Sequence, residues 1–364
     1  MTSGLYAGLM SGTSLDGVDG VLVEFFVNAP RIVASVHQPF DDRLRADLLA
    51  LSCPGDDELG RAARLGNELA RRYAAVIAAL LESASVHRQD VVAIGCHGQT
   101  VRHRPDEGYT VQIGNAALLA ELTSLRVVAD FRSRDVAAGG QGAPLVPAFH
   151  AAMFASRDEH RAVLNLGGIA NLSLLARDSG VTGFDCGPGN CLMDLWAARH
   201  LGVPFDRDGA WAGGGQVIPG LLEQLLGDPY FSACPPKSTG RELFREAWLN
   251  SQLSPGAVPR DVQATLLELT ARCVVSAIAL AGFSAQRVIV CGGGARNTAL
   301  MRRLEALLAP APTETSERHG IDPQQVEAAA FAWLAMQAVN GQPANLPAVT
   351  GARGPRVLGA IYPA

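Results

Sequence analysis

One pattern of apolar and glycine-rich segments occurs twice along the chain, and it limits the folds that are possible. Each half has two apolar runs joined by a polar turn, then a segment with apolar residues at helical spacing, then a buried strand that runs into a glycine turn. These segments are 6–26, 58–84 and 91–100 in the first half, and 162–178, 259–282 and 287–297 in the second. The pattern predicts two similar α/β lobes that present their glycine turns to one ligand across a cleft.

Composition narrows the function classes. The chain has 364 residues, enough for two domains, and its net charge of −5 and 6% aromatic content argue against a nucleic-acid binder. Its seven cysteines form no CxxC pair, which favours reduced thiols. The first residues lack the pattern of a signal peptide, and no apolar stretch reaches about 18 residues. We expect a cytoplasmic protein without nucleic-acid or membrane partners.

The turn in the first hairpin, GLMSGTSLDG at 8–17, is longer than a hairpin needs. Hairpins commonly turn in about two to five residues, and Asp16-Gly17 alone could serve. Successive glycine and hydroxyl residues form a concave set of backbone N–H groups that suits a phosphate. Asp16 is the candidate Mg²⁺ ligand, because Mg²⁺ prefers oxygen donors. We interpret the turn as a phosphate site, with a plain hairpin loop as the alternative.

Two familiar nucleotide motifs are absent. No GxxxxGK[ST] occurs, because Pro235-Pro236 precedes the KST at 237–239. The glycines at 292–294 are contiguous, so CGGGARN is not the GxGxxG of a dehydrogenase. A glycine triplet after a buried strand still allows adenine or ribose to lie against bare backbone.

The segment GFDCGPGNCLMD at 183–194 holds the candidate general base. We expect Asp185 at the end of a strand, before a Gly-Pro-Gly turn and a helix that Asn190 caps. A carboxylate in that position can take a proton from a substrate or a water. The alternative is that Asp185 only caps the turn.

Three further residues stand beside glycines or helix starts. His97 follows a buried strand, and Arg132 precedes a glycine loop, where a guanidinium could bind a carboxylate or phosphate with two hydrogen bonds. Pairing with each other is the favoured interpretation for Arg134 and Asp135. Glu327 opens an apolar helix at 326–339, and composition alone gives it no role.

These motifs together resemble the anhydro-N-acetylmuramic acid kinase family, in family order from residue 6 to residue 363. The segments that carry the resemblance are GLMSGTSLDGVD, CHGQT, DFRSRDVAAGGQGAPLVP, NLGGIANLS, FDCGPGN, PPKSTGRELF, DVQATLLELTA, CGGGARN, VEAAAFAWLA and VTGARGPRVLGAIYP. The resemblance implies two ribonuclease-H-like lobes of the actin and sugar kinase type around a central nucleotide and substrate cleft. We expect an N-terminal lobe at 1–128, a C-terminal lobe at 129–354, and a tail at about 355–364 that returns to the first lobe.

The resemblance also implies a reaction. ATP would phosphorylate O6 of 1,6-anhydro-N-acetylmuramic acid while water opens the anhydro bridge at C1, in cell-wall recycling. Asp185 would be the base, and His97, Arg132 and Glu327 would bind the sugar. The family is usually dimeric, so a homodimer is expected. ATP would be bound by Gly12, Thr13, Ser14, Leu15, Asp16, Gly17, Val18, Asp19, Gly167, Gly168, Gly292, Gly293 and Gly294, and Mg²⁺ would be bound by Asp16.

Two alternatives remain open. One is a kinase for another anhydro sugar such as levoglucosan, which lacks the lactyl carboxylate that Arg132 could bind. The other is an actin-like ATPase without sugar chemistry. A cysteine hydrolase built on Cys96 and His97 is disfavoured, because adjacent side chains on a strand point to opposite faces. Cys186 departs from the threonine that the family often has after the base.

Overall fold

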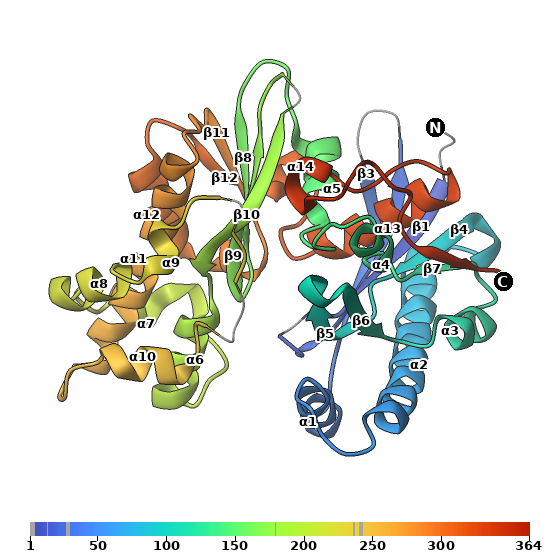
Figure 1. The fold of residues 1–364 in the computed structure, drawn as a ribbon, viewed down its shortest axis with the longest axis horizontal. Coiled ribbons are helices and arrows are strands. Elements are labelled where there is room, and N and C mark those ends of the chain that lie inside the picture. Colours follow the sequence, from blue (N-terminus) through green and yellow to red (C-terminus); the bar gives the residue numbers. More distant parts are fainter. Residues whose placement is uncertain (1–3, 13, 27–29, 179, 236, 240–242) are drawn as a thin grey trace. The chain divides into compact units, whose positions relative to one another are not determined.

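The computed structural model describes the chain apart from residues 1–3, 13, 27–29, 179, 236 and 240–242. It divides into two compact units, which Figure 1 shows in sequence colours. Unit 1 comprises Met1–Met153 and Gln325–Ala364, and unit 2 comprises Phe154–Gln324.

Unit 1 is built on a six-stranded sheet in the order β13-β7-β4-β1-β2-β3. β1 to β3 form an antiparallel meander, β4 and β7 run parallel to β1, and β13 pairs antiparallel with β7. A separate hairpin, β5-β6, follows β4. The strands are β1 Gly4–Met10, β2 Gly17–Phe25, β3 Pro30–Pro39, β4 Val91–Cys96, β5 Gln99–Arg104, β6 Tyr109–Ile113, β7 Val127–Ala129 and β13 Ala360–Tyr362.

Different helices cover the two faces of this sheet. The helices of the unit are α1 Asp42–Leu51, α2 Glu58–Ala84, α3 Ala116–Thr123, α4 Ser133–Ala137, α5 Val146–Phe154, α13 Val326–Val339 and α14 Pro347–Thr350. Leu9 faces α2 in a buried apolar cluster that also contains Tyr73 and Leu119. Its neighbour Gly8 faces α13 instead, since side chains alternate along a strand.

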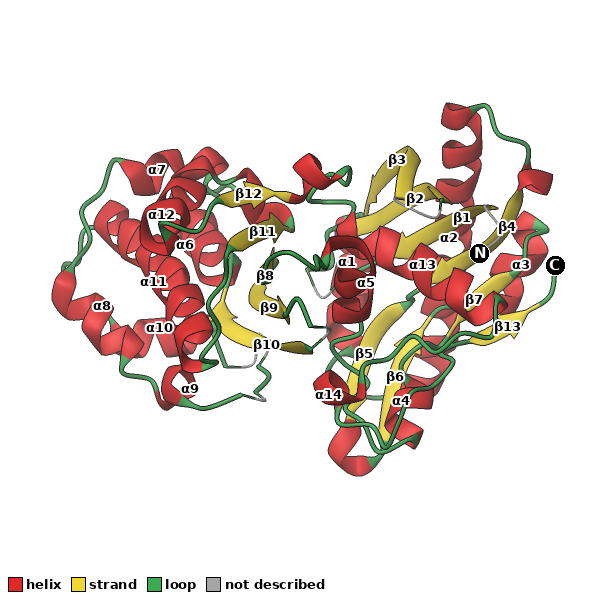
Figure 2. Cartoon of the chain, turned by 90° about the horizontal axis from the view of Figure 1, so that it is seen from above, coloured by secondary structure: helices red, strands yellow, loops and turns green. Residues whose placement is uncertain are grey.

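Two glycines let α13 approach the sheet closely (Figure 2). Gly8 of β1 and Gly95 of β4 are partners in the parallel register. A Cβ added to Gly8 would lie 1.9 Å from the Ala328 carbonyl oxygen, and one added to Gly95 would lie 2.0 Å from the Phe331 carbonyl oxygen. Because no side chain fits there, the backbone of α13 rests directly on the backbone of β1 and β4.

Unit 2 repeats the topology of unit 1. Its five-stranded sheet has the order β10-β9-β8-β11-β12, with an antiparallel meander from β8 to β10 and with β11 and β12 parallel to β8. This is the order β3-β2-β1-β4-β7 of unit 1, so the expected duplication of a ribonuclease-H-like lobe is confirmed. The strands are β8 Arg161–Leu166, β9 Ile169–Leu175, β10 Val181–Pro188, β11 Arg287–Cys291 and β12 Thr313–Thr315.

Helix α11 is the central helix of unit 2. It packs in an apolar cluster with residues of β8, β9, β10, α6 and α12. Among the residues that the structure describes, it is the one helix long and apolar enough to cross a membrane, and 78% of its apolar window is buried, as expected of a core helix. The helices are α6 Cys191–Leu201, α7 Ala210–Gly213, α8 Pro219–Leu226, α9 Pro229–Ser232, α10 Glu246–Gln252, α11 Pro259–Leu280 and α12 Thr298–Leu308.

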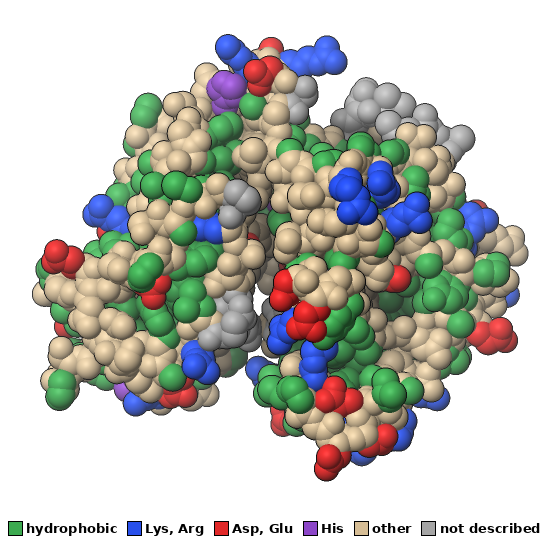
Figure 3. Space-filling model, in the orientation of Figure 1, with side chains coloured by type: hydrophobic (Ala, Val, Ile, Leu, Met, Phe, Trp, Pro, Cys, Tyr) green, Lys and Arg blue, Asp and Glu red, His purple; other side chains and the backbone are tan. Residues whose placement is uncertain are grey.

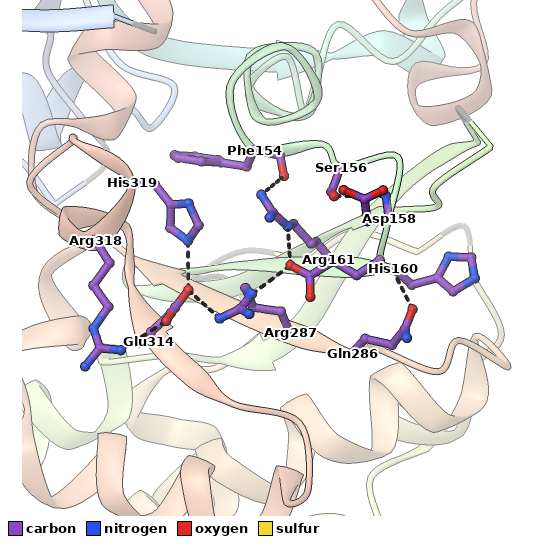
Figure 4. Close-up of polar contacts among 11 residues, drawn as sticks. Phe154, Ser156, Asp158, His160, Arg161, Gln286, Arg287, Glu314, Arg318 and His319 are labelled. Atoms are coloured by element: carbon purple, nitrogen blue, oxygen red, sulfur yellow. Dashed lines mark hydrogen bonds and ion pairs between the residues drawn. The ribbon is translucent and has the colours of Figure 1, made fainter. Parts of the chain in front are cut away.

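An ion-pair network links the N-terminal ends of β8, β11 and β12 (Figure 4). Glu159 accepts hydrogen bonds from Arg161 at 2.9 Å and from Arg287 at 2.7 Å. Arg287 also donates to Glu314 at 3.0 Å, and His319 lies 2.9 Å from the same carboxylate. Burial alone would raise the pKa of Glu314, but the bonds from His319 and Arg287 hold that pKa below its ordinary value. The network joins the N-terminal ends of these parallel strands. The glycine turns lie at the opposite, C-terminal ends of β8 and β11.

The unit boundaries differ from the expected 1–128 and 129–354. Residues 129–153 and 325–354 belong to unit 1. The reason is that β7 pairs with β4 and that α13 packs on β1 and β4, although α13 follows the second sheet in the sequence. The tail does lie on unit 1, where Ala360 pairs with Ala129.

The close packing of α13 on β1 and β4 gives a prediction about stability. Gly8→Ala is expected to lower the free energy of unfolding by about 3 kcal/mol or more, because the new methyl group overlaps the backbone of α13. Gly66→Ala in α2 is the matched control, since its Cβ would meet its nearest atom at an ordinary 3.5 Å. That control should stabilise the chain by up to about 1 kcal/mol. Equal effects in urea denaturation would contradict the close-approach explanation.

Acid should destabilise the fold through His150 of α5. Burial lowers the pKa of His150 from 6.5 to about 3. The unfolded chain therefore takes up this proton first, so the contribution to stability is complete above pH 6.5 and is lost as the pH falls toward 3. Denaturation at pH 6 and pH 5 should show that His150→Gln reduces the pH slope of the unfolding free energy by about 1.4 kcal/mol per pH unit. An unchanged slope would contradict the depressed pKa.

Candidate active site

The turn between β1 and β2 is held by the loop that follows β4. The Ser11 hydroxyl donates to the Gly98 carbonyl at 3.0 Å, and the Gln99 side chain donates to the Gly12 carbonyl at 3.2 Å. Leu15 has φ +55°, a conformation unusual for leucine that is typical of functional turns. Thr13 lies outside the described residues.

The residues predicted to bind phosphate divide into two groups. Gly17, Val18 and Asp19 already belong to β2, and Val18 is fully buried. Gly17 is required by packing, because a Cβ there would lie 2.4 Å from the Gln38 carbonyl oxygen. In contrast, a Cβ added to Gly12 would meet its nearest atom, Ser14 Oγ, at an ordinary 3.6 Å. The backbone of the turn around Gly12 is therefore the part that a ligand can approach.

Two carboxylates, Asp16 and Asp19, lie close enough in unit 1 to repel each other. Burial raises the pKa of Asp19, its bond to His37 opposes the shift, and repulsion from Asp16 adds to it. Asp16 is exposed and accepts a hydrogen bond from Ser14 at 2.6 Å. Within the described residues no cluster of three or more His, Cys, Asp or Glu could hold a metal. Two oxygen donors still suit Mg²⁺, which keeps several waters and binds phosphate oxygens.

His97, Arg132 and Glu327 come together in unit 1, as their shared prediction requires. Arg132 donates to His97 Nε2 from Nε at 3.2 Å and from Nη2 at 2.9 Å, and to the Gly142 carbonyl at 2.8 Å. Burial lowers the pKa of Arg132 to about 10, and the charge of Glu327 opposes that shift. The guanidinium therefore has two neutral acceptors, His97 and the Gly142 carbonyl, and a carboxylate, Glu327, whose charge acts on it.

The glycine loop beside Arg132 is supported by residues that sequence reasoning missed. Asp135 was expected to pair with Arg134, but it is fully buried and accepts from Asn345 at 2.7 Å, Thr350 at 2.8 Å and the Gly142 N–H at 2.8 Å. Asp135 therefore holds the N–H of Gly142, the same residue whose carbonyl accepts from Arg132. In the sequence, the only signal for these supporting residues was the TGARGP motif near the C-terminus, which begins with Thr350.

Asp185 lies inside β10 and not at its end. The register shifts between Asp185 and Gly187, so a β-bulge follows the carboxylate and re-aims the strand. The Thr239 N–H donates to Asp185 Oδ2 at 3.0 Å, and the Asp185 N–H donates to the Lys237 carbonyl at 3.1 Å. The Tyr230 hydroxyl donates to the Asp185 carbonyl at 2.9 Å. The KST segment at 237–239 is not part of a P-loop. It holds the candidate base Asp185 through the Thr239 N–H and the Lys237 carbonyl.

Cys186, next to Asp185, belongs to the apolar core of unit 2. It is 1% exposed, and burial raises its pKa well above the ordinary thiol value. A residue in this position packs against the core and is not available to a ligand. The departure from threonine therefore changes packing around the base.

The turn at Gly167 and Gly168 meets the start of α6. The Gly167 carbonyl accepts from the Asn190 N–H at 2.9 Å, and the Gly168 carbonyl accepts from the N–H groups of Gly189 and Cys191 at 2.9 and 3.1 Å. Asn190 was expected to cap α6, but its side chain makes no cap bond and donates to the Leu166 carbonyl at 3.0 Å. Backbone carbonyls of the turn replace the predicted side-chain cap.

The glycine triplet after β11 has two physical roles. A Cβ on Gly292, which has φ +81°, would lie 2.4 Å from Asn165 Oδ1, and one on Gly294 would lie 2.6 Å from Leu166 Cβ. Gly293 meets nothing within 4 Å. Two glycines therefore pack the triplet against β8, and Gly293 presents open backbone.

Two of the hollows among the described residues of unit 1 bear on the site. The larger of these two, about 460 Å³, lies between α1 and α2 and is lined by acidic and basic side chains. Figure 3 shows side chains of both charges mixed on the surface of the molecule. Its Arg72 is already paired with Asp41 and Glu68, and it includes none of the predicted residues. The smaller, about 110 Å³, is lined by His97, Asp130 and the start of α3. The smaller hollow is the one beside the Arg132 cluster.

Gly293 offers a test of the nucleotide contact. Gly293→Ala should leave the melting temperature unchanged and raise the KM for ATP about tenfold, because the methyl group occupies space that we assign to adenosine. Gly292→Ala should instead destabilise the fold. The control is Gly220→Ala in α8, another glycine with open space around it. An unchanged KM in Gly293→Ala would exclude this contact.

Comparisons with known proteins identify a family for the chain. A family model described as anhydro-N-acetylmuramic acid kinase matches residues 4–364. Proteins of that name from Variovorax paradoxus and Cupriavidus pinatubonensis are 58% and 56% identical, with 100% and 98% of each chain covered.

A solved structure supports the fold alone. The (R)-2-hydroxyglutaryl-CoA dehydratase component A of Acidaminococcus fermentans is 16% identical, with a TM-score of 0.50 over 91% of this chain and 96% of that one. The match of the family model and the identity of the relatives both extend over the whole length, and therefore the chain belongs to the anhydro-N-acetylmuramic acid kinase family.

Proposed function

We propose that this chain uses ATP and Mg²⁺ to phosphorylate O6 of 1,6-anhydro-N-acetylmuramic acid while water hydrolyses the 1,6-anhydro bridge. The products are N-acetylmuramic acid 6-phosphate and ADP, and the setting is the recycling of bacterial cell wall. The observation that carries the proposal is the family match over residues 4–364, with relatives up to 58% identical that are named anhydro-N-acetylmuramic acid kinase.

Asp185 acts as the base in this proposal. Water adds to C1 and gives its proton to the carboxylate while the C1–O6 bond breaks. The electron pair on O6 attacks the γ-phosphorus, and the bond from that phosphorus to the β,γ-bridging oxygen breaks, so that ADP leaves with the bridging oxygen. The Thr239 N–H donates to one oxygen of the carboxylate, and the bonds from Tyr230 and to Lys237 fix its backbone. A carboxylate held in this way can accept the proton of an adjacent water.

The glycine turns position ATP in this scheme. The backbone at Gly12 and Ser14 and the turn at Gly167 and Gly168 lie along the phosphates, and Gly293 lies against adenosine. Mg²⁺ held near Asp16 and Asp19 would neutralise charge on the phosphate oxygens. Phosphoryl transfer depends mainly on such positioning and charge neutralisation.

Arg132 and Glu327 bind the sugar in this proposal, and His97 lines their pocket. A guanidinium can bind the lactyl carboxylate of the muramic sugar with two hydrogen bonds. Levoglucosan lacks that group, so the muramic substrate is favoured. Turnover of the two sugars, measured side by side, decides between them.

We further propose a cytoplasmic homodimer without nucleic-acid or membrane partners. The family resemblance supports the dimer, and the net charge of −5 argues against a nucleic-acid partner. Light scattering of the purified chain tests the dimer.

Asp185→Asn separates the kinase from an actin-like ATPase. The variant should lose about 10³-fold in kcat for sugar phosphorylation, because water loses its base, while the KM for ATP stays within about threefold. Mass spectrometry of the sugar product checks the reaction, and Asp158→Asn, an exposed carboxylate of unit 2, is the control. Equal ATP hydrolysis by wild type and variant, without stimulation by any sugar, would overturn the kinase proposal.

A further inference from the structure

We infer that His97 is a positioning residue that couples the nucleotide turn to the sugar-binding arginine. Its Nδ1–H fixes the Ser11 carbonyl at the start of the nucleotide turn, and its Nε2 fixes the Arg132 guanidinium. The inference rests on the proposed function, and it moves His97 from a group that touches the sugar to one that acts through Arg132.

The chemistry of the two partners determines the ring's tautomer. A guanidinium only donates hydrogen bonds, so Nε2, at 3.2 and 2.9 Å from two of its nitrogens, must be an unprotonated acceptor. The proton is therefore on Nδ1, which donates to the Ser11 carbonyl at 3.3 Å. Burial and the charge of Arg132 lower the pKa of His97 to about 3, so the ring is neutral at neutral pH. Both ring nitrogens are thus engaged within unit 1.

The ring itself is held firmly. His97 is 5% exposed, and its ring centroid lies 4.7 Å from that of Phe331 in α13. The His97 N–H also donates to the Leu9 carbonyl at 3.0 Å, which ties its backbone to β1. A displacement of the guanidinium therefore reaches the Ser11 carbonyl through a ring that has little freedom to absorb it.

The first residues of the nucleotide turn rest on the same loop. Ser11 bonds the Gly98 carbonyl and the Tyr73 hydroxyl, and Gly12 accepts from Gln99. Arg132 is in turn held by the Gly142 carbonyl. A sugar acid that pulls on Arg132 and a phosphate that orders the turn therefore act on one connected set of bonds, and linkage makes any such coupling reciprocal.

Two substitutions each keep one of the ring's bonds. His97→Asn keeps a donor near the Nδ1 position for Ser11 and removes the acceptor for Arg132. His97→Gln keeps an acceptor near the Nε2 position for Arg132 and removes the donor to Ser11. His97→Asn should raise the KM for the anhydro sugar about tenfold and leave the KM for ATP within about twofold, and His97→Gln should show the reverse.

Several controls make the experiment decisive. His87→Asn and His87→Gln change an exposed histidine of the same unit and should alter neither KM. Melting temperatures are measured for all variants, because a purely structural role would change stability and move both KM values together. The crossed pattern supports the inference, and parallel changes or unchanged KM values overturn it.

Arg132→Lys gives an independent measurement if the His97 variants do not fold. One ammonium group cannot reproduce the bonds of the guanidinium to both His97 and Gly142. Bound anhydro sugar at saturation should raise the affinity of the wild type for a non-hydrolysable ATP analogue at least about threefold through His97, and this variant should lose that effect. An equal effect in both proteins, or no effect in the wild type, overturns the coupling. Failure of the wild type to phosphorylate the anhydro sugar would instead overturn the proposed function.

Discussion

The close approach of α13 to β1 and β4 is the contact on which the candidate site of unit 1 depends. Gly8 and Gly95 lie side by side in the register, so the helix rests on bare backbone. This contact fixes the position of Glu327 in the first turn of the helix. It also fixes Phe331, one turn later, against the His97 ring. A side chain at either glycine would lift the helix and move the groups that surround Arg132. The same close contact therefore packs the apolar helix α13 and positions the charged groups around Arg132.

Unit 2 uses the same topology for a different task. The parallel strands β8, β11 and β12 have ion pairs at their N-terminal edge, and glycine turns follow the C-terminal ends of β8 and β11. Gly292 and Gly294 are needed because a side chain at either position would clash with β8. Gly293 has open space around it. Asp185 is held where the bulge interrupts β10, by bonds from Thr239 and Tyr230. Ion pairs join the N-terminal ends of these strands, and open glycine backbone follows the C-terminal end of β11.

Local patterns were sufficient to predict many elements. The helices at 58–84 and 326–339 have the expected bounds, and both hairpins form. Their apolar residues recur at the spacing of the element itself, so neighbours in sequence carry the signal. The supports of the site were missed. Thr239 reaches Asp185 across 54 residues and Thr350 reaches Asp135 across 215, and no local pattern records such pairs.

The order of the amino acids was enough to establish the repeated α/β pattern, the family and the identity of the candidate groups, because motif and periodicity are local properties. The tertiary structure determined which segments share a unit: α13 packs on the first sheet although it follows the whole of the second sheet in the sequence. Folding also determined that His97 accepts from Arg132 and that Asp135 supports the glycine loop rather than pairing with Arg134. Burial and hydrogen bonding between distant residues select those partners, and the folded chain alone brings them together.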